Sequence, residues 1–193
     1  TAVKLYTVLI SLFTAFTGVM MPRMSSLIAE GKYEDFKRLT EKSIDILLTF
    51  VMPVIVLSMV FAPQIIAIIS GPGYKAAIIP MRIIVPLLLI IGYEQIIIVQ
   101  ILTPLKKDKA ILINSMLGGI VGILMNIILV SELHSIGSAI VWITAEITVL
   151  CSGQYFVTKF VGLKFPFRKV CVQVLYSLPI GVLCYGVVLL DLY

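Results

Sequence analysis

Residues 22–42, "PRMSSLIAEGKYEDFKRLTEK", decide the fold because they concentrate charge between two stretches that carry almost none. They hold nine of the 25 charged residues, namely Arg23, Glu30, Lys32, Glu34, Asp35, Lys37, Arg38, Glu41 and Lys42. Hydrophobic residues make up 60% of the chain, charged residues 13%, and the mean hydropathy is +1.12. Because a soluble domain is about half apolar and about one quarter charged, we expect an all-α integral membrane protein.

Six apolar segments are long enough to cross a bilayer, which takes roughly 20 residues as a helix. They are residues 5–21, 44–70, 83–105, 110–130, 136–158 and 170–190. Pro53 and Pro63 predict kinks in the second segment, and Pro86 predicts one in the third. The strands of a transmembrane barrel are short and alternating, unlike these continuous runs. We therefore expect one membrane domain over residues 1–193 with six transmembrane helices.

Basic residues alternate between the connections. The predicted loops 22–43, 106–109 and 159–169 hold 12 of the 15 lysines and arginines, and the others are Lys4, Lys75 and Arg82. Since cytoplasmic loops retain lysine and arginine, these three loops are predicted to face the cytoplasm. The same placement argues against nucleic acid as a partner, although the net charge is +5.

Within the first cytoplasmic connector, residues 22–43, the stretch "GKYEDFKRLTEK" (31–42) is expected to form a short surface helix. Glu34 with Arg38 and Lys37 with Glu41 are opposite charges at i,i+4 spacing. Phe36 and Leu39 are expected to rest on the membrane boundary.

Four stretches together resemble one family. "MMPRMSSLIAEGKYEDFKRLTEKS" resembles the loop after the eighth helix of bacterial Wzx-type O-antigen and capsule repeat-unit flippases of the MATE-like (MOP) superfamily. "APQIIAIISGPGYKAAIIPMRIIVPLLLIIG" looks like their ninth helix, outer turn and tenth helix. "QILTPLKKDKAILINSMLGGIVGILMNIILV" and "SIGSAIVWITAEITVL" look like the eleventh helix with its preceding connection and the opening of the twelfth. The order agrees over about residues 5–170.

The resemblance implies a plan of two six-helix lobes that face each other. This chain would be the C-terminal lobe without its first helix, followed by one extra helix, and its partner would be the missing N-terminal lobe of the same protein. The chain opens at Thr1 directly into an apolar run, so we expect a part of a longer protein. The implied substrate is an undecaprenyl-diphosphate-linked oligosaccharide in the bacterial plasma membrane, with membrane lipids around it.

A polar stripe is predicted on the third segment. In a straight helix Arg82, Tyr93 and Gln100 fall within about 20° of one another, and they could line a hydrophilic cavity or make interhelical hydrogen bonds. Arg82 could also reach the headgroups from the outer end. Under the resemblance, Arg82, Lys75 and Arg23 would attract the diphosphate.

Two acids lie near the middle of the predicted membrane segments. Glu94 in "IGYEQII" and Glu146 in "ITAEITV" cost about 2.5–3.5 kcal/mol each on insertion scales, so they call for an explanation. Each is a candidate for coupling transport to protons or sodium, or for a pair within the bundle. Glu146 shares a helix face with Trp142 and small residues.

The fourth segment contains a GxxxG pattern, Gly118 and Gly122, which predicts close helix packing. Asn126 lies on the same face and is expected to make an interhelical hydrogen bond or to line the cavity.

No enzyme signature occurs in the sequence. A Walker loop, a Ser-His-Asp set and metal-ligand spacing are all absent, and we expect neither a metal nor another cofactor. The three cysteines are expected to be buried free thiols. Two alternatives to the flippase stay open: a multidrug or organic-cation antiporter of the same superfamily, and a structural membrane subunit without transport.

Overall fold

The described part of the chain is all-α, with five helices long and apolar enough to cross a membrane, or six if one bent pair forms a single span. The computed structural model describes residues 2–190, with side chains except at 2–5, 72, 131–135, 185 and 187–190. Its elements are α1 (Ala2–Ala29), α2 (Tyr33–Val60), α3 (Ala62–Ser70), the 3₁₀-helix η1 (Pro72–Ala77), α4 (Ile78–Ile84), α5 (Leu87–Gln95), the π-helix η2 (Ile96–Leu102), α6 (Asp108–Val161) and α7 (Phe167–Leu190). No strand occurs between residues 2 and 190, and the side chain of Lys4 lies outside the described ones.

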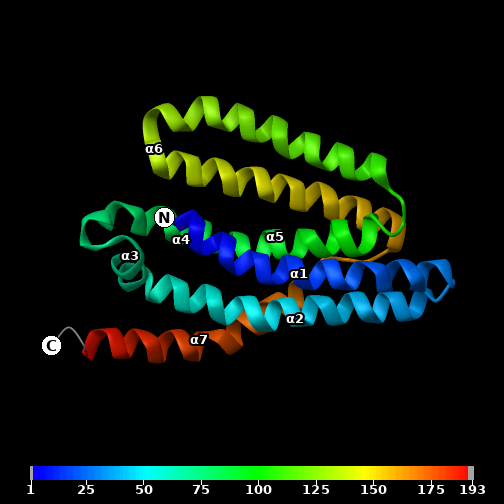
Figure 1. Cartoon of the computed structure of the whole chain (residues 1–193), viewed down its shortest axis with the longest axis horizontal. Helices are drawn as coiled ribbons and strands as arrows, with labels where there is room; N and C mark the ends of the chain where they lie inside the picture. Colours follow the sequence, from blue (N-terminus) through cyan, green and yellow to red (C-terminus); the bar gives the residue numbers. More distant parts are fainter. Residues whose placement is uncertain (1, 191–193) are drawn as a thin grey trace.

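Helix α6 is a hairpin of two antiparallel arms, Asp108–Val130 and Ile136–Val161 (Figure 1). The arms approach closely where glycine leaves room. A Cβ at Gly118 would lie 2.2 Å from Cγ2 of Val149, and one at Gly122 would lie 3.6 Å from Cβ of Ala145. The predicted close packing at the GxxxG pattern is therefore confirmed.

The α5–η2 segment forms the centre of the bundle. Leu87, Ile96 and Ile101 are completely buried, and the segment packs against α1, α2 and α6. Helix α7 lies outside this group along α2 (Figure 1), where a Cβ at Gly181 would lie 2.9 Å from Val56. Most of the apolar surface of α7 and of the first arm of α6 is exposed, as expected of helices that face lipid.

The kink predicted at Pro86 is confirmed, the one at Pro63 is found as a break two residues earlier, and Pro53 causes no break. The span that contains Pro86 bends by 42° between Ile84 and Leu87, because proline removes a helical hydrogen bond and clashes with the preceding turn. The second apolar segment breaks at Phe61, between α2 and α3, with Pro63 in the first turn of α3. Pro53 lies within α2 without a break.

The connector predicted over residues 22–43 is almost entirely helical. Helix α1 continues to Ala29 and α2 begins at Tyr33, so the apolar spans extend as a helical hairpin beyond their charged ends. Phe36 is only 2% exposed and belongs to the core rather than to the membrane boundary. The ion pairs form at i,i+3 spacing, Lys37 with Glu34 at 3.8 Å and Arg38 with Asp35 at 3.6 Å.

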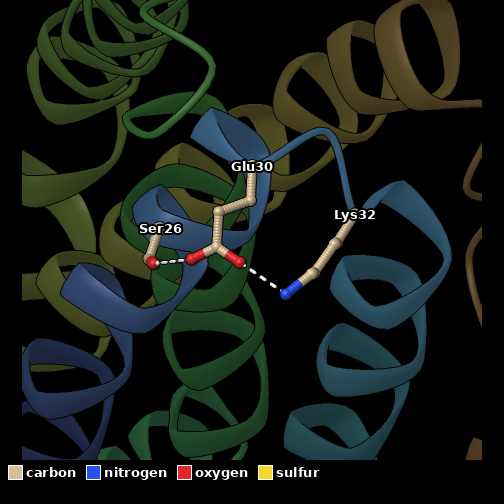
Figure 2. Close-up of polar contacts among 3 residues, drawn as sticks. All are labelled: Ser26, Glu30 and Lys32. Atoms are coloured by element: carbon tan, nitrogen blue, oxygen red, sulfur yellow. Dashed lines mark hydrogen bonds and ion pairs between the residues drawn. The ribbon is translucent and has the colours of Figure 1, made fainter.

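A small polar network closes the turn of this hairpin (Figure 2). The Lys32 Nζ lies 2.6 Å from Glu30, and the Ser26 hydroxyl donates to the same carboxylate at 2.7 Å. The hydrogen bond from Lys32, and to a smaller extent the one from Ser26, holds the pKa of Glu30 below its usual range. The Glu30 carboxylate in turn raises the pKa of Lys32. Gly31 supplies the positive φ, 70°, that the turn requires. Because the pair is exposed, it shapes the turn more than it stabilises the fold.

The three basic connections meet at one end of the molecule. The α1–α2 turn, the η2–α6 connection and the end of α6 lie together there (Figure 1). Lys37, Lys164 and Lys169 line a shared pocket of about 350 Å³, and Lys107 lies 4.6 Å from the ring centroid of Phe160. The charge asymmetry read from the sequence is thus an asymmetry between the two ends of the folded bundle.

Candidate functional site

Two carboxyl groups meet inside the bundle. Glu94 on α5 and Glu146 on the second arm of α6 lie close enough to interact electrostatically. The Glu94 side chain is 6% exposed, and its Oε1 has no hydrogen-bond partner among the described groups. A hydrogen bond between two carboxyl groups exists only when at least one of them carries a proton. The arrangement therefore suits a site that takes up and releases a proton or a small cation.

Aromatic side chains from two helices frame this acid pair. The indole Nε1 of Trp142 donates to Oε1 of Glu146 at 3.0 Å. The ring of Tyr6 on α1 packs edge-on against Trp142, with centroids 5.0 Å apart. The Tyr6 hydroxyl is buried without a hydrogen-bond partner and lies near both carboxyl groups. We call Tyr6, Glu94, Trp142 and Glu146 the acid cluster.

An open groove adjoins the acid cluster. It has a volume of about 460 Å³, lies between the two arms of α6, and is lined by Gly119, Gly122, Ile123, Asn126, Ile127, Ser138, Val141, Trp142 and Ala145. Trp142 belongs to both the groove and the acid cluster. The groove therefore ends one side chain away from the buried carboxyl pair.

Further polar contacts tie α5 to its neighbours. Gln95 accepts a hydrogen bond from Thr17 and donates one to Thr14, both at 2.9 Å. On the opposite side, the Tyr93 hydroxyl donates to Gln154 at 2.8 Å. These bonds hold α5 between α1 and the second arm of α6, and so fix the height at which Glu94 faces Glu146.

The predicted stripe of Arg82, Tyr93 and Gln100 does not form one lining. Arg82 is exposed, and its Nε donates to the carbonyl oxygen of Met59 at 3.2 Å. Tyr93 is buried against Gln154, and Gln100 is completely buried. The straight-helix projection fails because the break at Pro86 and the π-helix after Gln95 each change the register.

The other predicted binding residues are distributed over the surface. Lys75 is exposed in η1, at the end of the bundle opposite the basic connections. Arg23 lines a pocket between α1 and α2, and Asn126 lies exposed in the groove of α6. The interhelical bond expected of Asn126 is made instead by Asn114, whose side chain accepts from Ser152 on the other arm.

Sequence reasoning identified both acids but missed part of their surroundings. Trp142 was not missed, because the sequence placed it on the same helix face as Glu146, which it precedes by four residues. Tyr6 carried no such signal, because its place beside the acids depends on how α1 packs against α4 and α5. Among the described side chains, no group of three or more His, Cys, Asp and Glu could hold a metal ion. Cys151 and Cys171 are exposed rather than buried.

Comparison with known proteins leaves the family open. No protein-family model matches the chain, and neither a curated protein nor a solved structure matches it. The resemblance to the flippases therefore supports a proposal, and the geometry of the acid cluster is the independent observation to set beside it.

Proposed function

We propose that the chain is part of a flippase that moves undecaprenyl-diphosphate-linked oligosaccharide repeat units across the bacterial plasma membrane for surface polysaccharide synthesis. The ordered resemblance over about residues 5–170 carries this proposal, because it supplies the substrate class. A helical bundle with buried acids inside, apolar outer faces and one basic end is compatible with it.

The physical problem such a protein solves is the passage of a polar head through hydrocarbon. A glycan diphosphate cannot cross about 30 Å of lipid tails unaided. In the proposed plan a second lobe faces this one, the head moves between the lobes, and the lipid tail stays in the bilayer. Alternating access then arises when one lobe rocks against the other.

The acid cluster is the proposed coupling element. Glu94 and Glu146 change their interactions when a proton or sodium ion binds or leaves. Trp142 moves with Glu146 because it donates a hydrogen bond to it, and Tyr6 follows because its ring packs against Trp142. Since the cluster joins α1, α5 and α6, its charge state biases how these three helices pack. A bistable element of this kind is what coupled transport requires.

Deletion of the gene tests the flippase assignment. We expect surface polysaccharide to disappear and lipid-linked repeat units to accumulate in the inner leaflet, as measured by glycan staining and by leaflet-specific enzymatic labelling. Complementation with the wild-type gene restores both. Unchanged surface glycan after deletion favours a structural subunit and contradicts the proposal.

An organic-cation antiporter is the second candidate, and the acid cluster is the observation that favours it. Buried carboxylates suit a cationic substrate, whereas an anionic headgroup calls for cations such as Arg82. Arg82→Ala separates the two candidates when both activities are measured in the same complemented strain. If the protein is a flippase, we expect the substitution to reduce glycan export. If it is a cation antiporter, we expect resistance to cationic drugs to stay unchanged. Intact surface glycan together with lost drug resistance in Glu94→Gln cells supports the antiporter.

Orientation gives a separate prediction. In a variant whose native cysteines are replaced with serine, we expect Glu34→Cys to react with a membrane-impermeant maleimide only from the cytoplasm, and Lys75→Cys only from outside. Both positions are exposed, with 93% of the Glu34 side chain accessible. Phe36→Cys is the matched control, since its buried site should react only after denaturation. Labelling of Glu34→Cys from outside contradicts the orientation.

A further inference from the structure

A pocket of about 440 Å³ lies between α1 and α2 near the basic end. It shares no residue with the acid cluster or with the α6 groove. It is lined by Arg23, Leu27, Asp35, Arg38, Leu39 and Lys42. We call it the hairpin pocket. Leu27 and Leu39 pack against the core, so the apolar side of the pocket is fixed and the charged side chains surround its mouth.

The charge of the hairpin pocket is unbalanced. Three cations face one acid, Asp35, which lies 3.6 Å from Arg38 in an exposed ion pair. Among the described side chains, neither Arg23 nor Lys42 forms an ion pair. An anion that enters the pocket therefore meets a net charge of +2, with two cations free of acidic partners.

The position of the hairpin pocket along the helices matches a lipid headgroup. Arg23 follows the apolar stretch of α1, and Lys42 precedes the apolar stretch of α2 that begins at Ile44. The hairpin continues beyond both, to its turn at residues 30–32. The cations thus lie at the level where hydrocarbon gives way to headgroups, and basic pockets between helices at this level bind anionic lipids.

We propose that the hairpin pocket binds the phosphate of an anionic phospholipid in the leaflet that faces the basic end. The guanidinium groups of Arg23 and Arg38 offer paired donors that fit phosphate oxygens, and Lys42 adds a point charge. The acyl chains lie along the exposed apolar surface beside the pocket. Bound lipid would then join α1 to α2 at the membrane boundary. This lipid site is separate from the proposed transport of a glycan.

Native mass spectrometry of the purified chain with phosphatidylglycerol tests the proposal, with phosphatidylcholine as the zwitterionic reference. We expect the double variant Arg23→Gln/Lys42→Gln to weaken binding of phosphatidylglycerol by about tenfold or more, since it loses two charge-assisted contacts. The control Lys109→Gln/Lys159→Gln removes the same charge from the same end and should change binding by less than about twofold. Equal losses in the two variants, or none in either, overturn the proposal.

A gain of affinity separates binding from misfolding. Asp35→Asn removes the acid of the pocket and should tighten binding of phosphatidylglycerol, which a damaged fold cannot do. Farnesyl diphosphate and inorganic phosphate serve as competing probes. If farnesyl diphosphate binds tighter than phosphatidylglycerol and displaces it, the pocket is a substrate site; if inorganic phosphate displaces it equally well, the pocket is a free-anion site. Either result overturns the phospholipid assignment without touching the proposed transport.

Discussion

Under the proposed transport function, Glu94→Gln is expected to reduce transport by at least about tenfold while it leaves the fold intact. The substitution nearly keeps the size and shape of the side chain but removes the group that gains and loses charge beside Glu146. A charge-assisted hydrogen bond contributes about 1.5–3 kcal/mol, and each 1.4 kcal/mol is a factor of about ten in rate. Export of lipid-linked repeat units in complemented cells measures the loss.

Two controls make this result specific to the acid cluster. Glu41→Gln removes an exposed carboxylate from α2 and should leave transport unchanged. The thermal stability of Glu94→Gln should equal or exceed that of the wild type, because replacing a buried acid by a neutral group removes a desolvation cost. Wild-type transport in Glu94→Gln cells would contradict the coupling role.

Trp142 offers a direct optical readout of the same prediction. It is the single tryptophan of the chain, and its indole donates to Glu146. Its fluorescence should therefore change with pH when the carboxyl pair exchanges a proton, and the change should vanish in Glu146→Gln. If the acids are purely structural, the fluorescence of Trp142 should depend on pH in the same way in the wild type and in Glu146→Gln.

Much of the architecture could be predicted from segment length and charge. The spans follow from apolar runs of about 20 residues, and the basic end follows from the placement of 12 lysines and arginines. The close contact of Gly118 with the facing arm also follows from local spacing, since both arms are continuous helices. These features depend on residues that are close to one another in the sequence, so the sequence alone is enough to predict them.

The missed features depend on register and on partners distant in sequence. The helix projection placed Arg82 with Tyr93, but a 42° bend and a π-helix lie in the same span. Phe36 looked like a boundary residue because it stands among charges, yet the hairpin turns it into the core. Tyr6 comes near the acids only because α1 packs along α4 and α5, which brings its ring against Trp142. Tertiary packing thus decides which polar residues share a site.

Among the substitutions proposed for this chain, Gly118→Leu is expected to lower the free energy of unfolding the most. A Cβ at this position would lie 2.2 Å from Cγ2 of Val149, and the carbonyl of Ala145 would lie 3.7 Å away. Val149 is β-branched and cannot rotate its methyl groups freely out of a helix contact, so the two arms of α6 must separate. Overpacking of this kind costs about 1–3 kcal/mol or more, and the midpoint of thermal unfolding in detergent should fall by roughly 5–10 °C.

Gly119→Leu is the matched control for this prediction, because a Cβ there meets nothing within 4 Å. It should leave the midpoint unchanged or raise it slightly, since glycine costs about 1 kcal/mol within a helix. Val149→Ala should restore part of the stability lost in Gly118→Leu, because it removes the methyl groups that clash, and a double-mutant cycle measures that coupling. If the two glycine variants melt at the same temperature, the arms of α6 do not pack as a hairpin at Gly118, and the groove beside Trp142 loses its structural basis.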